Sequence, residues 1–257
     1  MTFSNIKPLN KRWNLVIPGD YISTLLFCTQ HFIQTCKKAI KDHGAFYVAL
    51  SGGSTPKALF ERITSPPQSK EIDWPHIHLF WSDERAVPPE DPDSNYHMAM
   101  EAGFKNMPIP KQQIYRMPAE TKNDADAMQY EKTIQTVLQG RAFDLVMLGM
   151  GEDGHTASLF PKSPGLKIKN RTVVSHLANE EKGWRMTFTM DLINAANAIV
   201  LYVLGAQKQH ILSDVLLSQT VKYPVQHVGT EVHPALWIAD EAAAGEFLKK
   251  ITLLKSY

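Results

Sequence analysis

The chain of 257 residues is poor in cysteine and has no long apolar run. Its two cysteines, Cys28 and Cys36, fall in one predicted helix, where ~1.5 Å of rise per residue separates them by ~12 Å, beyond disulfide reach. No stretch of ~18 apolar residues is present to span a bilayer, and residues 1–14 lack the apolar core of a signal peptide. We therefore expect a cytoplasmic protein with reduced cysteines.

The chain also lacks a large excess of positive or negative charge. Its 27 Lys and Arg side chains nearly balance 26 Asp and Glu side chains, and the net charge is +1. This balance gives no reason to expect nucleic-acid or membrane partners. The G-x-x-x-x-G-K-[ST] pattern of nucleotide P-loops and the G-x-S-x-G pattern of serine hydrolases are absent. Any anion site must therefore be local and of another kind.

What is present is an alternation of strand and helix patterns, in a composition of 44% hydrophobic and 21% charged residues. Strands are predicted at residues 13–17, 46–50, 77–82, 143–148, 172–177, 185–190, 198–204 and 235–239. Helices are predicted at residues 21–41, 94–102, 124–138 and 208–217. This order predicts a single α/β domain over residues 1–257: a doubly wound, mainly parallel sheet flanked by helices, with several antiparallel strands near the C-terminal half.

Residues 143–161, FDLVMLGMGEDGHTASLFP, are typical of a buried strand, a tight turn and the start of a helix. The turn contains three glycines, Gly149, Gly151 and Gly154. It places Asp153 and His155 at the carboxyl end of a parallel strand, the edge where open α/β sheets bind ligands. The stretch is therefore a candidate active-site turn.

Two other interpretations of this turn are open. Its glycines spell G-x-G-x-x-G after a strand, as in dinucleotide-binding folds. That motif also requires an acidic residue about 20 positions later, at the end of a strand, whereas Glu180 and Glu181 lie farther along in a polar segment. The simpler alternative is a turn whose histidine only caps a helix.

A second glycine turn follows the predicted strand at residues 46–50, and it consists of Ser51, Gly52, Gly53, Ser54 and Thr55. Thr55 is expected to be the N-cap of a helix whose first residue is Pro56. Free backbone N–H groups at the positive end of a helix suit a phosphate. The alternative is a plain connection between a strand and a helix, which also needs small residues.

Charged residues follow the strand at residues 77–82, where Asp83, Glu84 and Arg85 stand together. Arg85 can bind a phosphate or carboxylate through its planar guanidinium, or it can simply pair with Glu84 or Asp91 on the surface. Lys208 begins a predicted helix, an unfavourable place for a cation unless an anion binds there. His76 and His78 lack a third ligand nearby, so no metal is predicted.

Four motifs resemble those of 6-phosphogluconolactonases in order and spacing, and the resemblance extends from about residue 15 to residue 244. They are LSGGSTP at residues 50–56, WSDER at 81–85, GMGEDGHTASLFP at 149–161 and GAQK at 205–208. RMTFT at residues 185–189 and LWIADEAA at 236–243 are also similar to the family, although Gly183 and Trp184 replace its usual proline-containing approach to Arg185.

The resemblance implies the fold shared with glucosamine-6-phosphate deaminase, ribose-5-phosphate isomerase and coenzyme A transferases. It also implies hydrolysis of 6-phospho-D-glucono-1,5-lactone to 6-phospho-D-gluconate in the oxidative pentose phosphate pathway. The expected protein is a monomer that acts on a small sugar-phosphate lactone without a metal or a cofactor.

Lactone hydrolysis needs an activated water and stabilisation of an oxyanion. An imidazole can accept the water proton near neutral pH, so His155 is the expected general base, oriented by Asp153. Backbone N–H groups of residues 149–151 are expected to stabilise the oxyanion. The residues expected to bind the phosphate and sugar hydroxyls are Ser51, Gly52, Gly53, Ser54, Thr55, Asp83, Arg85, Gly151, Arg185 and Lys208.

Two alternative functions stay open at this point. The first is a related sugar-phosphate enzyme, a deaminase or an isomerase. Those deaminases typically continue after the histidine with I-A-F-N-E-P, whereas residues 156–161 here are TASLFP, without the acid. The second is a non-catalytic sugar-phosphate sensor, which has no need of the imidazole.

Overall fold

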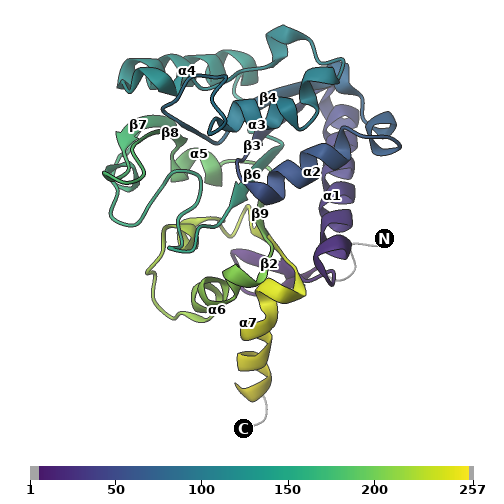
Figure 1. The fold of residues 1–257 in the computed structure, drawn as a ribbon, viewed down its shortest axis with the longest axis vertical. Coiled ribbons are helices and arrows are strands. Elements are labelled where there is room, and N and C mark those ends of the chain that lie inside the picture. The colour runs from purple at the N-terminus through teal and green to yellow at the C-terminus, as the bar shows by residue number, and fades with distance from the viewer. Residues whose placement is uncertain (1–5, 255–257) are drawn as a thin grey trace.

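A computed structural model describes residues 6–254 of the chain (Figure 1). The helices are α1 (Tyr21–His43), α2 (Ser54–Ile63), α3 (Asn95–Glu101), α4 (Asp124–Leu138), α5 (Met190–Asn194), α6 (Gln209–Leu217) and α7 (Glu241–Leu254). The strands are β1 (Lys7–Pro8), β2 (Trp13–Val16), β3 (Phe46–Leu50), β4 (Ile77–Trp81), β5 (Asp83–Arg85), β6 (Leu145–Gly149), β7 (Val173–Leu177), β8 (Trp184–Phe188), β9 (Ile199–Val203) and β10 (Ala235–Ala239). Within residues 6–254, no helix is both apolar enough and long enough to traverse a membrane.

The main sheet has seven strands in the order β1-β2-β10-β9-β6-β3-β4. Every neighbouring pair is parallel except β1 and β2. Strands β3, β9 and β10 are buried at every position, as expected for parallel strands covered by helices on both faces. The predicted α/β class and the doubly wound, mainly parallel sheet are therefore confirmed.

The strand order reverses between β3 and β6. From β3 the chain continues outward to β4, whereas from β6 it crosses to β9 on the other side of the sheet. The segments that leave the carboxyl ends of β3 and β6 therefore separate and leave a crevice. Ligands of open α/β sheets bind at such a point, and both predicted glycine turns follow these two strands.

A second sheet of three antiparallel strands has the order β5-β8-β7. Ser82 joins the two sheets, because its N–H donates to the Leu50 carbonyl of β3 and its carbonyl accepts from Phe188 N–H of β8, each at 2.8 Å. The chain thus turns from β4 directly into β5. A few antiparallel strands were predicted, but β1 and β5 lie in the N-terminal half of the chain.

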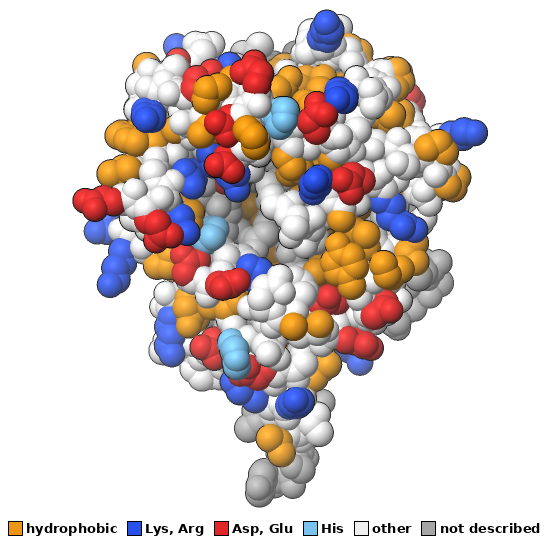
Figure 2. All heavy atoms as spheres, in the orientation of Figure 1, with side chains coloured by type: hydrophobic (Ala, Val, Ile, Leu, Met, Phe, Trp, Pro, Cys, Tyr) orange, Lys and Arg blue, Asp and Glu red, His pale blue; other side chains and the backbone are white. Residues whose placement is uncertain are grey.

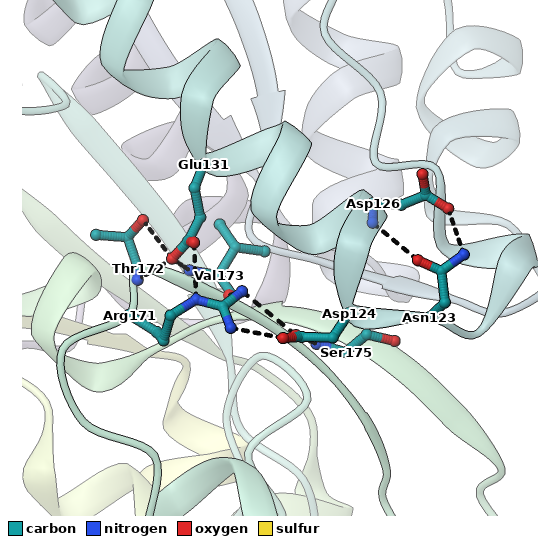
Figure 3. A network of polar contacts seen from close by, with 8 residues as sticks. All are labelled: Asn123, Asp124, Asp126, Glu131, Arg171, Thr172, Val173 and Ser175. Carbon is teal, nitrogen blue, oxygen red and sulfur yellow. Dashed lines mark hydrogen bonds and ion pairs between the residues drawn. The ribbon is translucent and has the colours of Figure 1, made fainter.

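Helix α4 is attached to the second sheet by the polar network in Figure 3. Glu131 of α4 accepts hydrogen bonds from the backbone N–H groups of Thr172 and Val173 and, at 2.7 Å, from Arg171 Nε. The same guanidinium pairs with Asp124 at 2.6 Å. These contacts fix the helix that leads into β6 against the start of β7.

Three local predictions are wrong. Thr55 is not the N-cap of α2: the cap is Gly53, with φ +102°, and Pro56 is the third helical residue. No helix follows the glycine turn after β6, where residues 150–163 form successive turns closed by a bridge between Thr156 and Leu159. Helix α5 was missed, because Met190 was assigned to the predicted strand at residues 185–190 and residues 191–194 were assigned to no element.

The buried apolar side chains form one continuous cluster that includes residues of both sheets and of the helices packed on them. Cys28 and Cys36 lie within it as free thiols. This continuity favours the predicted organisation as one domain.

Candidate active site

A cavity of about 380 Å³ lies at the crevice between β3 and β6. Figure 2 shows the hollow near the middle of one face, with basic side chains and a histidine at its margin. Nine predicted site residues line the cavity: Ser51, Gly52, Gly53, Asp83, Arg85, Gly151, His155, Arg185 and Lys208. Ser54 and Thr55 are not part of its lining, and Asp153 contacts it only through His155.

His155 and Asp153 form a close pair on the turn after β6. The His155 Nδ1 to Asp153 Oδ1 distance is 2.5 Å, and the same oxygen accepts from the His155 backbone N–H at 3.1 Å. Burial alone would raise the pKa of the Asp153 carboxyl, but these hydrogen bonds outweigh burial and lower that pKa. Asp153 is therefore ionised at neutral pH and fixes the proton of His155 on Nδ1, which leaves Nε2 as the basic nitrogen.

Gly151 is required for this close arrangement. A Cβ atom at this position would lie 2.0 Å from His155 Nδ1 and 2.7 Å from Asp153 Oδ1. Its N–H donates to the His155 carbonyl at 2.9 Å and closes the turn. The prediction that this N–H stabilises an oxyanion is therefore wrong, because its hydrogen bond is already made.

The aromatic ring of Phe160 packs against the imidazole of His155. Its ring centroid lies 4.2 Å from that of His155, with 33° between the planes, and its side chain is buried in the cavity wall. Thr156 fixes the turn to the strand, because its hydroxyl donates to the Gly149 carbonyl at 2.8 Å. The ring of His155 is thus confined while about 28% of the side chain stays accessible.

The facing wall comes from β5 and β8. Arg85 and Arg185 stand directly opposite each other in this antiparallel pair. Burial, and then the neighbouring Arg85 charge, lower the pKa of the Arg185 guanidinium. Neither arginine makes an ion pair with a carboxylate within residues 6–254. Two like charges held together, with neither in an ion pair, indicate a site for an anion.

The sequence offered two roles for Arg85: binding an anion, or pairing with Glu84 or Asp91 on the surface. The structure does not show the surface pair. The Arg85 guanidinium donates to the Asp93 carbonyl rather than to Glu84 or Asp91, and the side chain lines the cavity. The buried Glu84 carboxylate instead accepts from the backbone N–H groups of Arg85, Asn95 and Tyr96 at 2.8 Å each. It thereby joins the start of α3 to β5.

Asp83 is a buried carboxylate on the same wall. Its Oδ2 accepts from the Ser158 hydroxyl at 2.7 Å, so the side chain is oriented by the segment that follows His155. It is the acidic residue among those that line the cavity, beside four cations: Arg85, Arg185, Lys182 and Lys208. The cavity is strongly positive although the whole chain is nearly neutral.

The remaining wall consists of the turn after β3 and the turn that carries Lys208. The N-terminus of α2 has no side-chain cap in the part of the chain that the structure describes, which leaves its backbone N–H groups available to an anion. Lys208 ends a 3-10 turn, Ala206–Lys208, and is the N-cap of α6. Both turns place polar groups in one cavity.

Sequence reasoning missed three residues of this site. Asn95 lines the cavity, and its Oδ1 would lie 1.9 Å from a Cβ atom at position 52, so Gly52 is needed for space. Lys182 reaches the cavity from the connection between β7 and β8. Phe160 belongs to the motif at residues 149–161, but no contact with the site was predicted for it. Ser94 and Asn95 stand together at the start of a predicted helix, and this pair of polar residues could have indicated Asn95. No sequence pattern indicated Lys182.

Fold and site together define an α/β protein with a cation-lined cavity beside a histidine–carboxylate pair. The family model for glucosamine-6-phosphate isomerases/6-phosphogluconolactonase matches residues 24–237. The chain belongs to this family, as its motifs suggested.

Similarity to individual proteins extends over most of the chain. A 6-phosphogluconolactonase of Nostoc sp. is 39% identical over 216 residues, which cover 81% of this chain and 87% of that protein. The crystal structure of 6-phosphogluconolactonase from Thermotoga maritima is 26% identical with a TM-score of 0.75, covering 88% and 98% of the two chains. A monomeric glucosamine-6-phosphate deaminase has a TM-score of 0.77 at 16% identity, with 90% and 99% covered, which shows a shared fold alone.

Proposed function

We propose that the protein hydrolyses 6-phospho-D-glucono-1,5-lactone to 6-phospho-D-gluconate. The observation that carries this proposal is the pairing of His155 with an ionised Asp153 at the wall of a cavity lined by several cations. The names of its relatives support the same substrate, since the similarity covers most of both chains. The proposal includes a cytoplasmic monomer without nucleic-acid or membrane partners. The near-neutral net charge supports the lack of such partners.

In the proposed mechanism, His155 Nε2 accepts a proton from water while the oxygen of that water attacks the lactone carbonyl carbon. The tetrahedral oxyanion is stabilised by the positive side chains of the cavity. Collapse of this intermediate breaks the ring ester bond, and the imidazolium returns its proton to the leaving ring oxygen. One water is consumed, and the product is a hydroxy acid that ionises. Asp153 holds the imidazole and balances its transient charge.

The phosphate is expected to bind the cationic part of the cavity. Candidate ligands are Arg85, Arg185 and Lys208, with the backbone at Gly52 and Gly53. Because the phosphate does not react, its contacts are equal in the ground and transition states and lower KM rather than raise kcat.

Proton release after addition of freshly prepared lactone tests the proposal. We expect rapid release with the phosphorylated lactone and a far lower kcat/KM with unphosphorylated gluconolactone, each corrected for spontaneous hydrolysis. Lys208→Ala should raise KM for the phosphorylated lactone by about tenfold or more, the effect of losing one charge-assisted hydrogen bond. Ammonia release from glucosamine 6-phosphate without lactone hydrolysis would instead identify a deaminase.

A further inference from the structure

Asp240 is a fully buried carboxylate at the junction of β10 and α7, outside the cavity lining. Its Oδ1 accepts the N–H of Ala243 at 2.8 Å, in the first turn of α7. Both of its oxygens also face the N–H of Gly205, at 3.0 and 3.1 Å. One carboxylate therefore joins the start of α7 to the end of the neighbouring strand β9.

Gly205 begins the short turn that carries Lys208. It has φ +98°, and its carbonyl accepts the Lys208 N–H at 3.0 Å. A Cβ atom at this position would lie 2.5 Å from Gln207 Oε1. The orientation of this peptide, and with it the path of the next three residues, therefore depends on what holds the Gly205 N–H.

Helix capping alone does not require the second contact. Asp20, the N-cap of α1, accepts the Ser23 N–H at 2.8 Å, and within residues 6–254 its side chain bonds only to groups of its own helix. Asp240 makes the equivalent bond to its own helix and, in addition, binds the peptide 35 residues earlier. The two caps thus differ in the one contact that leads toward the cavity.

We propose that Asp240 is a positioning residue that holds Lys208 in the cavity through Gly205 and so sets the affinity for the phosphate end of the substrate. This inference rests on the proposed function, in which Lys208 binds that phosphate. Asp240 itself contacts neither the substrate nor the reacting atoms.

Asp240→Asn tests this role because the amide keeps Oδ1 for the Ala243 N–H but replaces Oδ2, one of the two oxygens that face the Gly205 N–H, with an N–H donor. We expect KM for the phosphorylated lactone to rise by about three- to tenfold, since a loosened contact costs a fraction of one charged hydrogen bond. The kcat value, and kcat/KM for unphosphorylated gluconolactone, should change less than about twofold. Asp20→Asn makes the same chemical change at a cap that neither lines the cavity nor contacts Gly205, and it should leave all three constants unchanged.

The double variant Lys208→Ala/Asp240→Asn separates positioning from general loosening. If Asp240 acts through Lys208, adding Asp240→Asn to Lys208→Ala produces no further rise in KM, as expected for two residues in one coupled unit. The inference would be overturned if the rises in KM of the two single variants multiplied in the double variant, or if KM were unchanged in Asp240→Asn. An equal fall in kcat/KM with both lactones would also overturn it. Calorimetric binding of 6-phosphogluconate should show the same pattern as KM.

Asp240→Ser serves as a second variant if the asparagine protein folds poorly, because serine can cap α7 but is too short to reach Gly205 as well. The thermal transition and circular dichroism of each variant establish that it is folded. Failure of the wild type to hydrolyse the lactone, or an unchanged KM in Lys208→Ala, would count against the proposed function. An effect of Lys208→Ala that Asp240→Asn does not reproduce would count against Asp240 alone.

Discussion

At the scale of single residues, the chemistry depends on three positions within one turn. Asp153 is held close to His155 by their hydrogen bonds, and Gly151 leaves the space that both side chains need. The spacing D-G-H was visible in the sequence, and so was the pairing it predicts. The hydrogen bond from the Gly151 N–H to the His155 carbonyl was not visible, because it depends on how the turn closes.

Asp153→Asn tests the orientation of the imidazole. The amide removes the charge that balances the imidazolium and no longer fixes one tautomer, so kcat should fall by about 10²- to 10⁴-fold. KM should change little, because Asp153 is not among the residues that line the cavity. Steady-state kinetics with Asp42→Asn, on α1, as the control would check this. A kcat within twofold of the wild type would show that the carboxylate has no part in the reaction.

At the scale of elements, strand positions were predicted well because buried parallel strands are short apolar runs bounded by turn residues. The strands β3 and β10 were predicted to the residue. Helix ends were predicted less well: Thr55 has the side chain of an N-cap, yet the cap of α2 is Gly53, which lines the cavity. The charged residues after β4 form a separate strand, β5, in the second sheet. This strand exists because it pairs with β8, and no local sequence pattern predicts that pairing.

Glu131→Ala is expected to destabilise the fold without changing the site. The substitution leaves the backbone N–H groups of Thr172 and Val173 and the guanidinium of Arg171 without their acceptor, which should cost about 1 to 3 kcal/mol of unfolding free energy. Denaturant unfolding measures this loss, and kcat should stay unchanged. Glu101→Ala, which breaks an exposed pair with Lys105, is the control and should have no measurable effect.

The pH dependence of this difference has a definite sign. Burial opposes ionisation of Glu131, but its hydrogen bonds prevail and lower the pKa of the carboxyl in the folded protein. Its stabilisation is therefore fully present above the ordinary carboxyl pKa and is lost as pH falls through the lowered folded value. The gap in stability between the wild type and Glu131→Ala should shrink on acidification. A gap that widens toward low pH would contradict the network in Figure 3.

At the scale of the whole molecule, the site is assembled from segments far apart in the chain. Parallel strands bring the turns after β3 and β6 together at the reversal of strand order, which is why the sequence could place them in one site. The contribution of Lys182 could not be predicted, because it depends on how the connection between β7 and β8 lies over the cavity. A nearly neutral chain thus has one strongly positive cavity.

The most direct test of the account is the rate of proton release from 6-phosphogluconolactone by His155→Ala. The variant should fold, keep KM within about twofold and lose about 10²- to 10⁴-fold in kcat, the usual contribution of a general base. A folded His155→Ala protein with nearly full turnover would contradict the central claim that this imidazole activates the water.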